Sequence, residues 1–474
     1  MSALHDLTAL EQARAIATGE VSSVELTEHY LARSTTLNAD LGAFITLTPE
    51  LALEQARAAD ELVARTSDPS GLSVLHGVVV PVKDLNFVTG VPCTFGSKAF
   101  GLTPTIDDYV VTRLRQGHTV MTGKTNTPEF GLTCYTENLV TGPARTPWDL
   151  TRSAGGSSGG AAAAVAAGLA PVAQGSDGGG SLRIPASVCG LVGLKTSRGR
   201  ISNGPMRDGV GDLGVNGPLA RTVADAAALL DVMSGHFVDD PFVAPPLEAG
   251  MTFLTAAQRD PGKLRIGRYC TPVISDVAID SECMAAYEHA TDLLTSLGHV
   301  VEDVPAPFPA NVAESFETLW SVLALLTPVA PELESELMPL SRWLRDRGRG
   351  VSGIELASAA WILRNVARGA INMHAGYDVI LTPALAQTPR LIGQLRNDLD
   401  PAADFEAQKQ FTPFTAPYNM TGQPALSVPL YWTEANLPIG VQLVGRPFDE
   451  VTILSLAGQL ERAKPWAHRH PEMW

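Results

Sequence analysis

Ser153-Ala-Gly-Gly-Ser-Ser-Gly-Gly160 and Gln174-Gly-Ser-Asp-Gly-Gly-Gly-Ser-Leu-Arg-Ile-Pro-Ala186 are glycine-rich segments of a 474-residue chain, joined by an alanine-rich stretch with helical character. Glycines on both sides of Ser157 and directly before Ser181 permit unusual backbone torsions and the close approach of a ligand. Consecutive N–H groups at 178–181 would form a nest for a developing oxyanion. The second segment therefore predicts oxyanion donors and a serine hydroxyl on one loop.

A serine hydroxyl is a weak nucleophile at neutral pH, so a neighbouring group must accept its proton. None of the ten histidines lies in a motif, and His118, the nearest to either serine in sequence, lies beside the apolar run TVMTG. A Ser-His-Asp triad stays an alternative only because triads are assembled in space. Lys83 is the better base, since it ends the apolar run VVVPVKD, where burial would lower its pKa and favour the neutral amine. The competing interpretation is a structural lysine salt-bridged to Asp84.

Apolar runs and amphipathic stretches alternate along most of the chain. GVVVPV (77–82) and HTVMTG (118–123) are predicted strands, and DDYVVTRLRQ (107–116) between them is a predicted helix. This alternation is typical of α/β proteins with a mainly parallel sheet. Helix caps and helical periodicity dominate the start of the chain instead.

Composition excludes several classes of partner. The net charge of -16 would repel nucleic acid and anionic membranes, so a small molecule or another protein is the expected partner. Five scattered cysteines without a CxxC pair predict free thiols in a reducing compartment. The first 20 residues are charged throughout and show no secretory signal, which predicts a cytoplasmic protein. The charge-free run from Ser153 to Ser176 is too weakly hydrophobic to span a bilayer.

Five stretches, read together, resemble the amidase signature family over almost the whole chain: GVVVPVKDL, TGKTNTPEF, GGSSGG, GSDGGGSLRIPASVCGLVGLK and PYNMTGQPALSVPL. The resemblance implies a three-layer α/β/α sandwich around a large mixed, mainly parallel sheet. It also implies hydrolysis of amides, and sometimes esters or carbamates, without metal or cofactor. Lys83 would be the general base, Ser157 a bridging serine held by a cis peptide bond, and Ser181 the acylated nucleophile. The two serines are 24 residues apart, as the family pattern requires.

The resemblance assigns further positions by their match to the family. The oxyanion hole would consist of Gly178, Gly179, Gly180 and Ser181. Gly131, through its backbone, Tyr135 and Ser157 would contact substrate. Ser158, Asp177 and Arg183 would hold the two serine loops, whereas Trp148 in the same region is expected to pack in the core.

Three departures from the family pattern leave every catalytic atom in place. Gly178 stands where the family usually has threonine or another side chain, which suggests a more flexible oxyanion loop. Thr196 replaces the proline of the usual Lys-Pro-Thr, and Ala161 stands where serine is frequent.

A phosphate-binding loop is suggested by a second motif, because Gly117 precedes Gly123-Lys124-Thr125. Five residues separate the glycines, whereas the phosphate-loop pattern requires four. Nucleotide binding is therefore not expected.

The resemblance divides the chain into an N-terminal helical layer at 1–70 and a catalytic domain at 71–474. Within that domain, 76–235 would form the catalytic core and about 300–410 a variable helical region at the substrate pocket. The large apolar residues of that region would line the pocket or, more often, pack in the core: Trp320, Leu323, Trp343, Trp361 and Ile362. An apolar pocket would suit aryl amides, anilides or carbamates.

Three functions remain open at this stage. The first is a stand-alone amidase, monomeric or homodimeric, acting on a small-molecule amide or carbamate. The second is the glutaminase subunit of a tRNA-dependent amidotransferase, against which PFTAPYNMTGQPALSVPL lacks the acidic pattern expected for glutamine recognition. The third is a non-catalytic binding or scaffold protein that has kept the fold.

Overall fold

A large mixed sheet forms the centre of the computed structural model, which describes residues 3–206, 209–309 and 312–474. Eight strands run in the order β4-β6-β5-β10-β11-β9-β7-β8. A smaller sheet of order β1-β3-β2 adjoins β4, where the Gln174 N–H donates to the Pro81 carbonyl at 3.1 Å. The strands are β1 (Phe44–Leu47), β2 (Val82–Lys83), β3 (Gly123–Thr125), β4 (Val172–Asp177), β5 (Val192–Lys195), β6 (Val215–Ala220), β7 (Arg265–Arg268), β8 (Val300–Asp303), β9 (Val379–Pro383), β10 (Ala425–Trp432) and β11 (Pro438–Gly445).

The strands of the large sheet are mostly antiparallel, so the prediction of a mainly parallel sheet is wrong in that detail. Among the described strands of this sheet, the parallel pairs are β7 with β8 and β7 with β9, and the other neighbouring strands are antiparallel. The strands β4 and β5 do run in the same direction, but β6 lies between them and is antiparallel to both. Strand–helix alternation predicts the direction of consecutive strands. It does not show which later strand is inserted between them.

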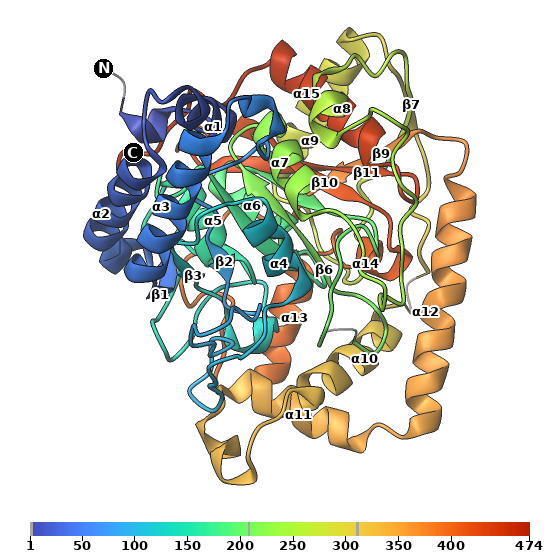
Figure 1. The fold of residues 1–474 in the computed structure, drawn as a ribbon. Helices are drawn as coiled ribbons and strands as arrows, with labels where there is room; N and C mark the ends of the chain where they lie inside the picture. The colour runs from blue at the N-terminus through green and yellow to red at the C-terminus, as the bar shows by residue number, and fades with distance from the viewer. Residues whose placement is uncertain (1–2, 207–208, 310–311) are drawn as a thin grey trace.

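Helices cover both faces of the sheet, which confirms the α/β class and the three layers (Figure 1). The two faces of β5 show why, because its side chains alternate between them. Val192 and Leu194 belong to the apolar cluster that contains α7. Gly193 lies between them and faces the opposite side of the sheet, because a Cβ added to it would lie 2.5 Å from the Cβ of Ala186 in α6. One outer layer contains α7 (Val223–Met233), α8 (Phe253–Gln258) and α15 (Glu450–Ala463), and the other contains α5 (Gly159–Ala166) and α6 (Arg183–Cys189).

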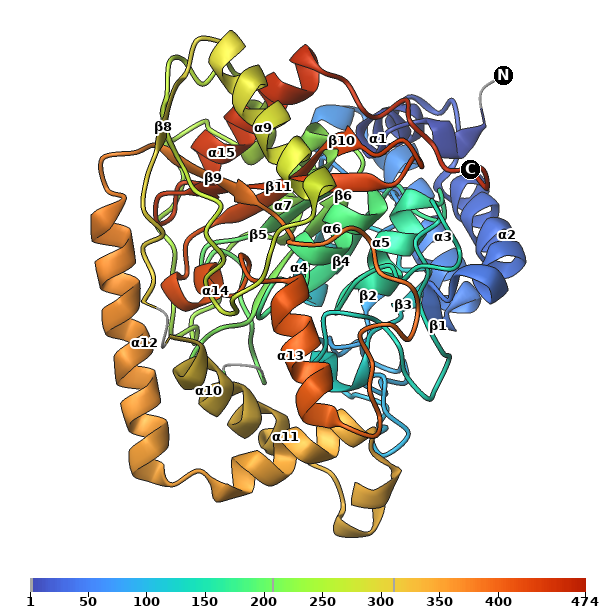
Figure 2. The ribbon, with the colours of Figure 1, turned by 180° about the vertical axis from the view of Figure 1, so that it is seen from behind.

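The N-terminal helices pack beside the small sheet, and both ends of the chain meet there (Figures 1 and 2). They are α1 (Ala9–Thr18), α2 (Ser23–Leu41) and α3 (Pro49–Arg65). Ser22 caps α2 and forms a capping box with Glu25, which satisfies two N–H groups at the helix start. The indole N–H of Trp474 donates to Asp6 at 2.9 Å.

A second group of helices surrounds the opposite end of the molecule, and Figure 2 shows α10, α11 and α12 following one another around it. These helices are α10 (Val312–Leu326), α11 (Pro339–Gly350), α12 (Gly353–Met373) and α13 (Pro401–Phe411); the remaining ones are α4 (Tyr109–Gln116), α9 (Ser281–Ser296) and α14 (Pro417–Thr421). In the part of the chain that the structure describes, no helix has the length and apolar character needed to cross a membrane. All five cysteines are free thiols.

Glu461 on α15 is a half-buried residue with one carboxyl oxygen inside the protein, and its ionisation should destabilise the fold. Burial raises its pKa from 4.5 to about 7, although the Val223 N–H donates to it at 3.1 Å. The folded state therefore holds a proton that the unfolded chain releases between about pH 4.5 and 7, and stability falls as pH rises through that window. We expect Glu461→Gln to stabilise the protein by about 1–3 kcal/mol at pH 8 and to have little effect at pH 4.5. Urea unfolding at both pH values measures this, with exposed Glu434→Gln as the matched control. A gain that is equal at the two pH values would contradict the assignment.

Candidate active site

Lys83 ends β2 with a fully buried side chain that points at three serines. Its Nζ lies 2.7 Å from Ser157 Oγ, 2.9 Å from Ser158 Oγ and 3.1 Å from Ser176 Oγ. The Lys83 backbone N–H donates to the Gln174 side chain at 2.9 Å, which fixes β2 against β4. The amine therefore lies among hydroxyl oxygens that can both accept and donate protons.

The competing interpretation of Lys83 required a salt bridge with Asp84. The structure pairs Asp84 with a different lysine, because Lys124 Nζ lies 2.9 Å from its carboxylate inside the protein. Lys124 is on β3 and also donates to the Asn86 carbonyl at 2.7 Å. The lysine of the phosphate-loop-like sequence is thus a buried structural residue.

Ser157 lies on a tight loop whose Gly156–Ser157 peptide bond is cis, as the family resemblance implies. Gly131 lies next to it with φ of +71°, and an added Cβ would lie 2.6 Å from Leu85 Cδ1 and 3.3 Å from Ser157 Oγ. The positive φ favours glycine at position 131, and a side chain there would displace Leu85 and approach Ser157. The structure therefore places the backbone of Gly131 next to Ser157.

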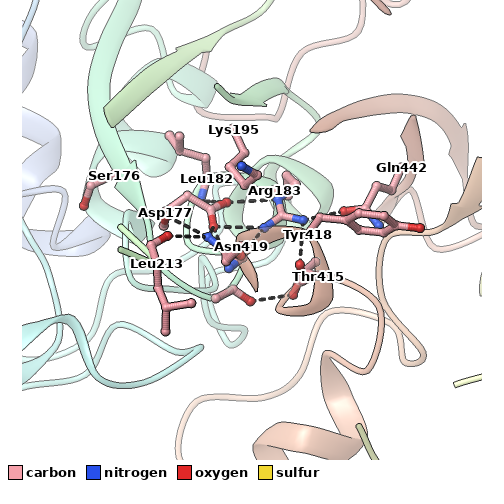
Figure 3. A network of polar contacts seen from close by, with 12 residues as sticks. Ser176, Asp177, Leu182, Arg183, Lys195, Leu213, Thr415, Tyr418, Asn419 and Gln442 are labelled. Carbon is pink, nitrogen blue, oxygen red and sulfur yellow. Dashed lines mark hydrogen bonds and ion pairs between the residues drawn. The ribbon is translucent and has the colours of Figure 1, made fainter. Parts of the chain in front are cut away.

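Ser181 lies on the neighbouring loop, four residues after the end of β4. Figure 3 shows the hydrogen-bonded pair Asp177 and Arg183, which hold this loop in shape. The two Asp177 carboxylate oxygens accept from the Gly180 N–H at 2.7 Å and the Leu182 N–H at 3.1 Å. Arg183 donates to both oxygens of the same carboxylate, at 3.0 and 2.9 Å. The Ser158 N–H donates to the Ser181 carbonyl at 3.1 Å, which joins the two serine loops.

Charge and hydrogen bonding keep Asp177 ionised although it is fully buried. Burial opposes ionisation, but the charge and hydrogen bonds of Arg183, the charge of Lys195 and a hydrogen bond from Asn419 hold the pKa of Asp177 well below its usual value. Arg183 also donates to the Thr415 carbonyl, the Asn419 side chain and the Gln442 side chain, at 2.8, 2.7 and 2.6 Å. Figure 3 shows this arginine between the Ser181 loop and the C-terminal third of the chain.

One predicted oxyanion donor is engaged elsewhere. The Gly180 N–H is used by Asp177, so this glycine cannot offer it to a substrate. Among the described residues, no hydrogen bond engages the N–H groups of Gly178, Gly179 or Ser181. These three remain candidates for the oxyanion nest.

A cavity of about 620 Å³ opens onto Ser157, Ser176 and Ser181, with Gly131 and Gly178 at its wall. No histidine is found among its lining residues in the described ranges, which removes support for a histidine triad. Large apolar residues form most of the wall: Phe87, Phe95, Phe100, Phe130, Leu132, Met206, Leu213, Phe242, Trp320 and Leu323. Phe87, Phe95 and Phe100 stack in succession, with ring centroids 5.6 and 4.4 Å apart.

Several predicted residues lie in places other than those expected. Tyr135 is not on the cavity wall, because the chain turns its ring into the core, where its hydroxyl donates to Asp404 at 2.8 Å. Trp320 and Leu323 line the cavity, although core was favoured for most of the large apolar residues around them. Trp361 is neither core nor wall, since 68% of it is exposed on α12. Trp343 and Trp148 are half-buried instead of core residues, and they pack against Phe405 and Trp432 respectively.

Sequence reasoning missed the C-terminal partners of Arg183. Thr415 and Asn419 belong to the matched stretch PYNMTG and its surroundings, but more than 230 residues separate them from Arg183. Ser176 was also missed, although it lies five residues before Ser181 in the quoted segment. At Thr196, the hydroxyl donates to the Asn216 carbonyl at 2.9 Å, so a hydrogen bond fixes the chain where the family has proline.

The fold and the buried lysine–serine site together define an α/β enzyme with an amidase-like centre. A family model described as Amidase matches residues 25–454, and the chain belongs to this amidase family of carbon–nitrogen hydrolases. "Putative amidase AmiB2" of Mycobacterium tuberculosis is 39% identical, over 98% of this chain and 98% of the relative. The 6-aminohexanoate-cyclic-dimer hydrolase of Paenarthrobacter ureafaciens is 38% identical, over 98% and 96%. A solved structure of 6-aminohexanoate cyclic dimer hydrolase superposes with a TM-score of 0.90, at 36% identity and complete coverage of both chains.

Proposed function

We propose that this amidase cleaves small apolar amides through an acyl-enzyme on Ser181, with Ser157 and Lys83 as its proton relay. The observation that carries the proposal is the 2.7 Å contact between Lys83 Nζ and Ser157 Oγ at the wall of the cavity that Ser181 also lines. A neutral amine there can accept the proton that Ser157 passes on.

The proposed reaction has two halves that use the same relay. In acylation, the Ser181 oxygen bonds to the amide carbonyl carbon, its proton moves to Ser157, and the Ser157 proton moves to Lys83. When the carbon–nitrogen bond breaks, Ser157 protonates the departing nitrogen and regains a proton from Lys83. In deacylation, water attacks the ester carbon, loses its proton to the relay, and Ser181 leaves with a proton returned from it.

The oxyanion of each tetrahedral intermediate would be held by the N–H groups of Gly178, Gly179 and Ser181. Losing one such donor in other hydrolases costs about 3–4 kcal/mol of transition-state stabilisation. Asp177 accepts a hydrogen bond from the Gly180 N–H and is itself held by Arg183, so the loop has its shape before the substrate binds. The N–H donors of the oxyanion hole are therefore already in position.

The wall of the cavity indicates the substrate class. Stacked phenylalanines and Trp320 would favour aryl amides and anilides, with carbamates and esters as related acyl substrates. Free glutamine carries two charges next to the side chain that is cleaved, and this wall is mostly apolar. We therefore place the amidotransferase-type glutaminase second, and a glutaminase assay with and without candidate partner subunits separates the two.

A serine-directed probe tests the proposal against a non-catalytic scaffold. We expect an aryl fluorophosphonate to add one equivalent to the folded protein, at Ser181 in the peptide map, and to abolish hydrolysis of 4-nitroacetanilide in the same proportion. Unfolded protein is the control, because the reaction needs the relay. Labelling at another serine, or none in folded protein, would contradict the nucleophile assignment.

We also propose that the enzyme acts in the cytoplasm as a monomer or homodimer without nucleic acid. Five free thiols suit a reducing compartment, and the net charge of -16 opposes binding to polyanions. Sedimentation of the purified protein and fractionation of its natural host check these two points, and a disulfide-linked or exported form would contradict them.

A further inference from the structure

A second, much smaller cavity lies beside the reacting serine. Its volume is about 60 Å³, and it shares Gly131, Leu132, Ser181 and Trp320 with the large cavity. Ser157 lines the large cavity only. Since one water-sized sphere needs about 10–15 Å³ on this scale, the small cavity has room for about four to six non-hydrogen atoms.

Trp320 forms the partition between the two cavities. Its indole N–H donates to the Leu132 carbonyl at 3.2 Å, and its ring stacks on Phe316 with centroids 5.3 Å apart. Phe316 lines the small cavity, whereas Leu323, one turn beyond Trp320 along α10, lines the large one. The tryptophan is thus held in place from two sides.

The same indole covers the oxyanion loop. A Cβ added to Gly178 would lie 3.5 Å from the outer edge of the Trp320 ring, and one added to Gly179 would lie 3.6 Å from Phe316. Gly178 has a φ outside the left-handed region, so its backbone would accept a side chain. Threonine, common in the family at this position, would place its further atoms against the indole. The indole of Trp320 therefore leaves room for glycine at position 178 but not for the further atoms of threonine.

The position of Ser157 decides which half of an amide occupies each cavity. The departing nitrogen must lie near Ser157, because that hydroxyl protonates it in the proposed mechanism. The nitrogen and its substituent then lie in the large cavity. The acyl substituent, on the other side of the carbonyl carbon, is directed toward the small cavity.

We infer that the small cavity behind Trp320 is the acyl-group site, and that its volume restricts the enzyme to amides of short acyl groups joined to bulky apolar amines. The inference rests on the proposed function, because it uses the Ser157 proton path. Trp320 is a specificity-determining residue in this assignment, with no part in bond breaking.

Two substrate series test the assignment. In the first, the amine is 4-nitroaniline and the acyl group is acetyl, butyryl or octanoyl. We expect kcat/KM to fall at least about 10-fold from acetyl to octanoyl, the effect of a few excluded methylenes. In the second, the acyl group is acetyl and the amine is benzylamine or the larger biphenylmethylamine, and for this pair we expect no loss. The assignment would be overturned if kcat/KM fell with the size of the amine and did not change with the length of the acyl chain.

Variants at the partition give a second readout. Trp320→Ala joins the cavities, so it should reduce the acetyl-to-octanoyl ratio by about 10-fold, with Trp320→Leu intermediate. Exposed Trp361→Ala is the matched control and should leave the ratio unchanged. Gly178→Thr should lower kcat/KM at least about 10-fold in the wild-type background. In the double variant with Trp320→Ala, the same substitution should lower kcat/KM much less. This non-additivity does not depend on either single variant being fully stable.

The failures of the two proposals are distinguishable. If no substrate is cleaved and Ser181 stays unlabelled, the proposed function fails. If substrates are cleaved through Ser181 but all acyl lengths react equally, or the ratio is the same in Trp320→Ala, the acyl-site assignment alone fails.

Discussion

Ser181→Ala is expected to lower kcat for 4-nitroacetanilide by about 10³- to 10⁶-fold, because removing the nucleophile of a serine hydrolase removes the covalent path altogether. The cavity and the oxyanion donors remain, so substrate should still bind. Lys83→Met should cause a loss of similar size, and the double variant should be little worse than either, since the relay acts as a unit. Stopped-flow detection of nitroaniline release, with mass spectrometry of the acyl-enzyme, measures both steps.

The control for this prediction is Ser296→Ala, a serine exposed at the end of α9 and remote from the cavity lining. It should leave kcat unchanged. Circular dichroism should show that the Ser181 and Lys83 variants are folded. Turnover within 10-fold of wild type in folded Ser181→Ala would require a different nucleophile, and Ser176, at 3.1 Å from Lys83 Nζ, would be the next to test.

The oxyanion nest with Ser181 could be predicted from one short glycine-rich segment, whereas the roles of the surrounding residues depended on the family resemblance. Ser157, Ser158, Asp177 and Arg183 occur within two short glycine-rich segments, and the structure joins those segments by a backbone hydrogen bond. Lys83 depended on the family resemblance, since a strand-end lysine beside Asp84 has an ordinary structural explanation. The structure pairs Asp84 with Lys124 and places the Lys83 amine against three serine hydroxyls.

The parts that could not be predicted depend on contacts between distant segments. No local pattern shows that β6 inserts between β4 and β5, and this insertion makes the sheet largely antiparallel. Gly180 was expected to donate to the oxyanion because it lies in a run of glycines. Its N–H donates to the Asp177 carboxylate instead, and this hydrogen bond depends on the fold of the loop. Tyr135 follows Gly131 closely in sequence, yet its partner Asp404 is on α13.

Arg183→Met is expected to cause a larger loss of stability than any other single substitution at the active site. The side chain is fully buried, and its loss would leave Asp177 as a buried carboxylate without its cation. Breaking such a pair from one side costs about 3–5 kcal/mol. Because the same carboxylate holds the Gly180 and Leu182 N–H groups, activity should fall as well, through a displaced Ser181 loop.

The pairing also predicts how stability depends on pH. The folded-state pKa of Asp177 is depressed, so its contribution is complete above the unfolded value of 3.8 and is lost as pH falls through the folded value. Arg183→Met should abolish that acid-side loss, so the wild-type and variant curves of unfolding free energy should converge as the pH is lowered.

A double-mutant cycle separates the ion pair from the rest of the Arg183 network. Asp177→Asn removes the charge and keeps the shape of the side chain, but it replaces one of the two acceptor oxygens with an NH2 donor. If charge pairing dominates, Arg183→Met should cost at least about 1 kcal/mol less in the Asp177→Asn background than in wild type, as measured by urea unfolding. Equal costs in the two backgrounds would show that Arg183 acts mainly through Thr415, Asn419 and Gln442. Its role would then be to anchor the C-terminal third of the chain beneath the oxyanion loop, and activity in Asp177→Asn would be expected to survive.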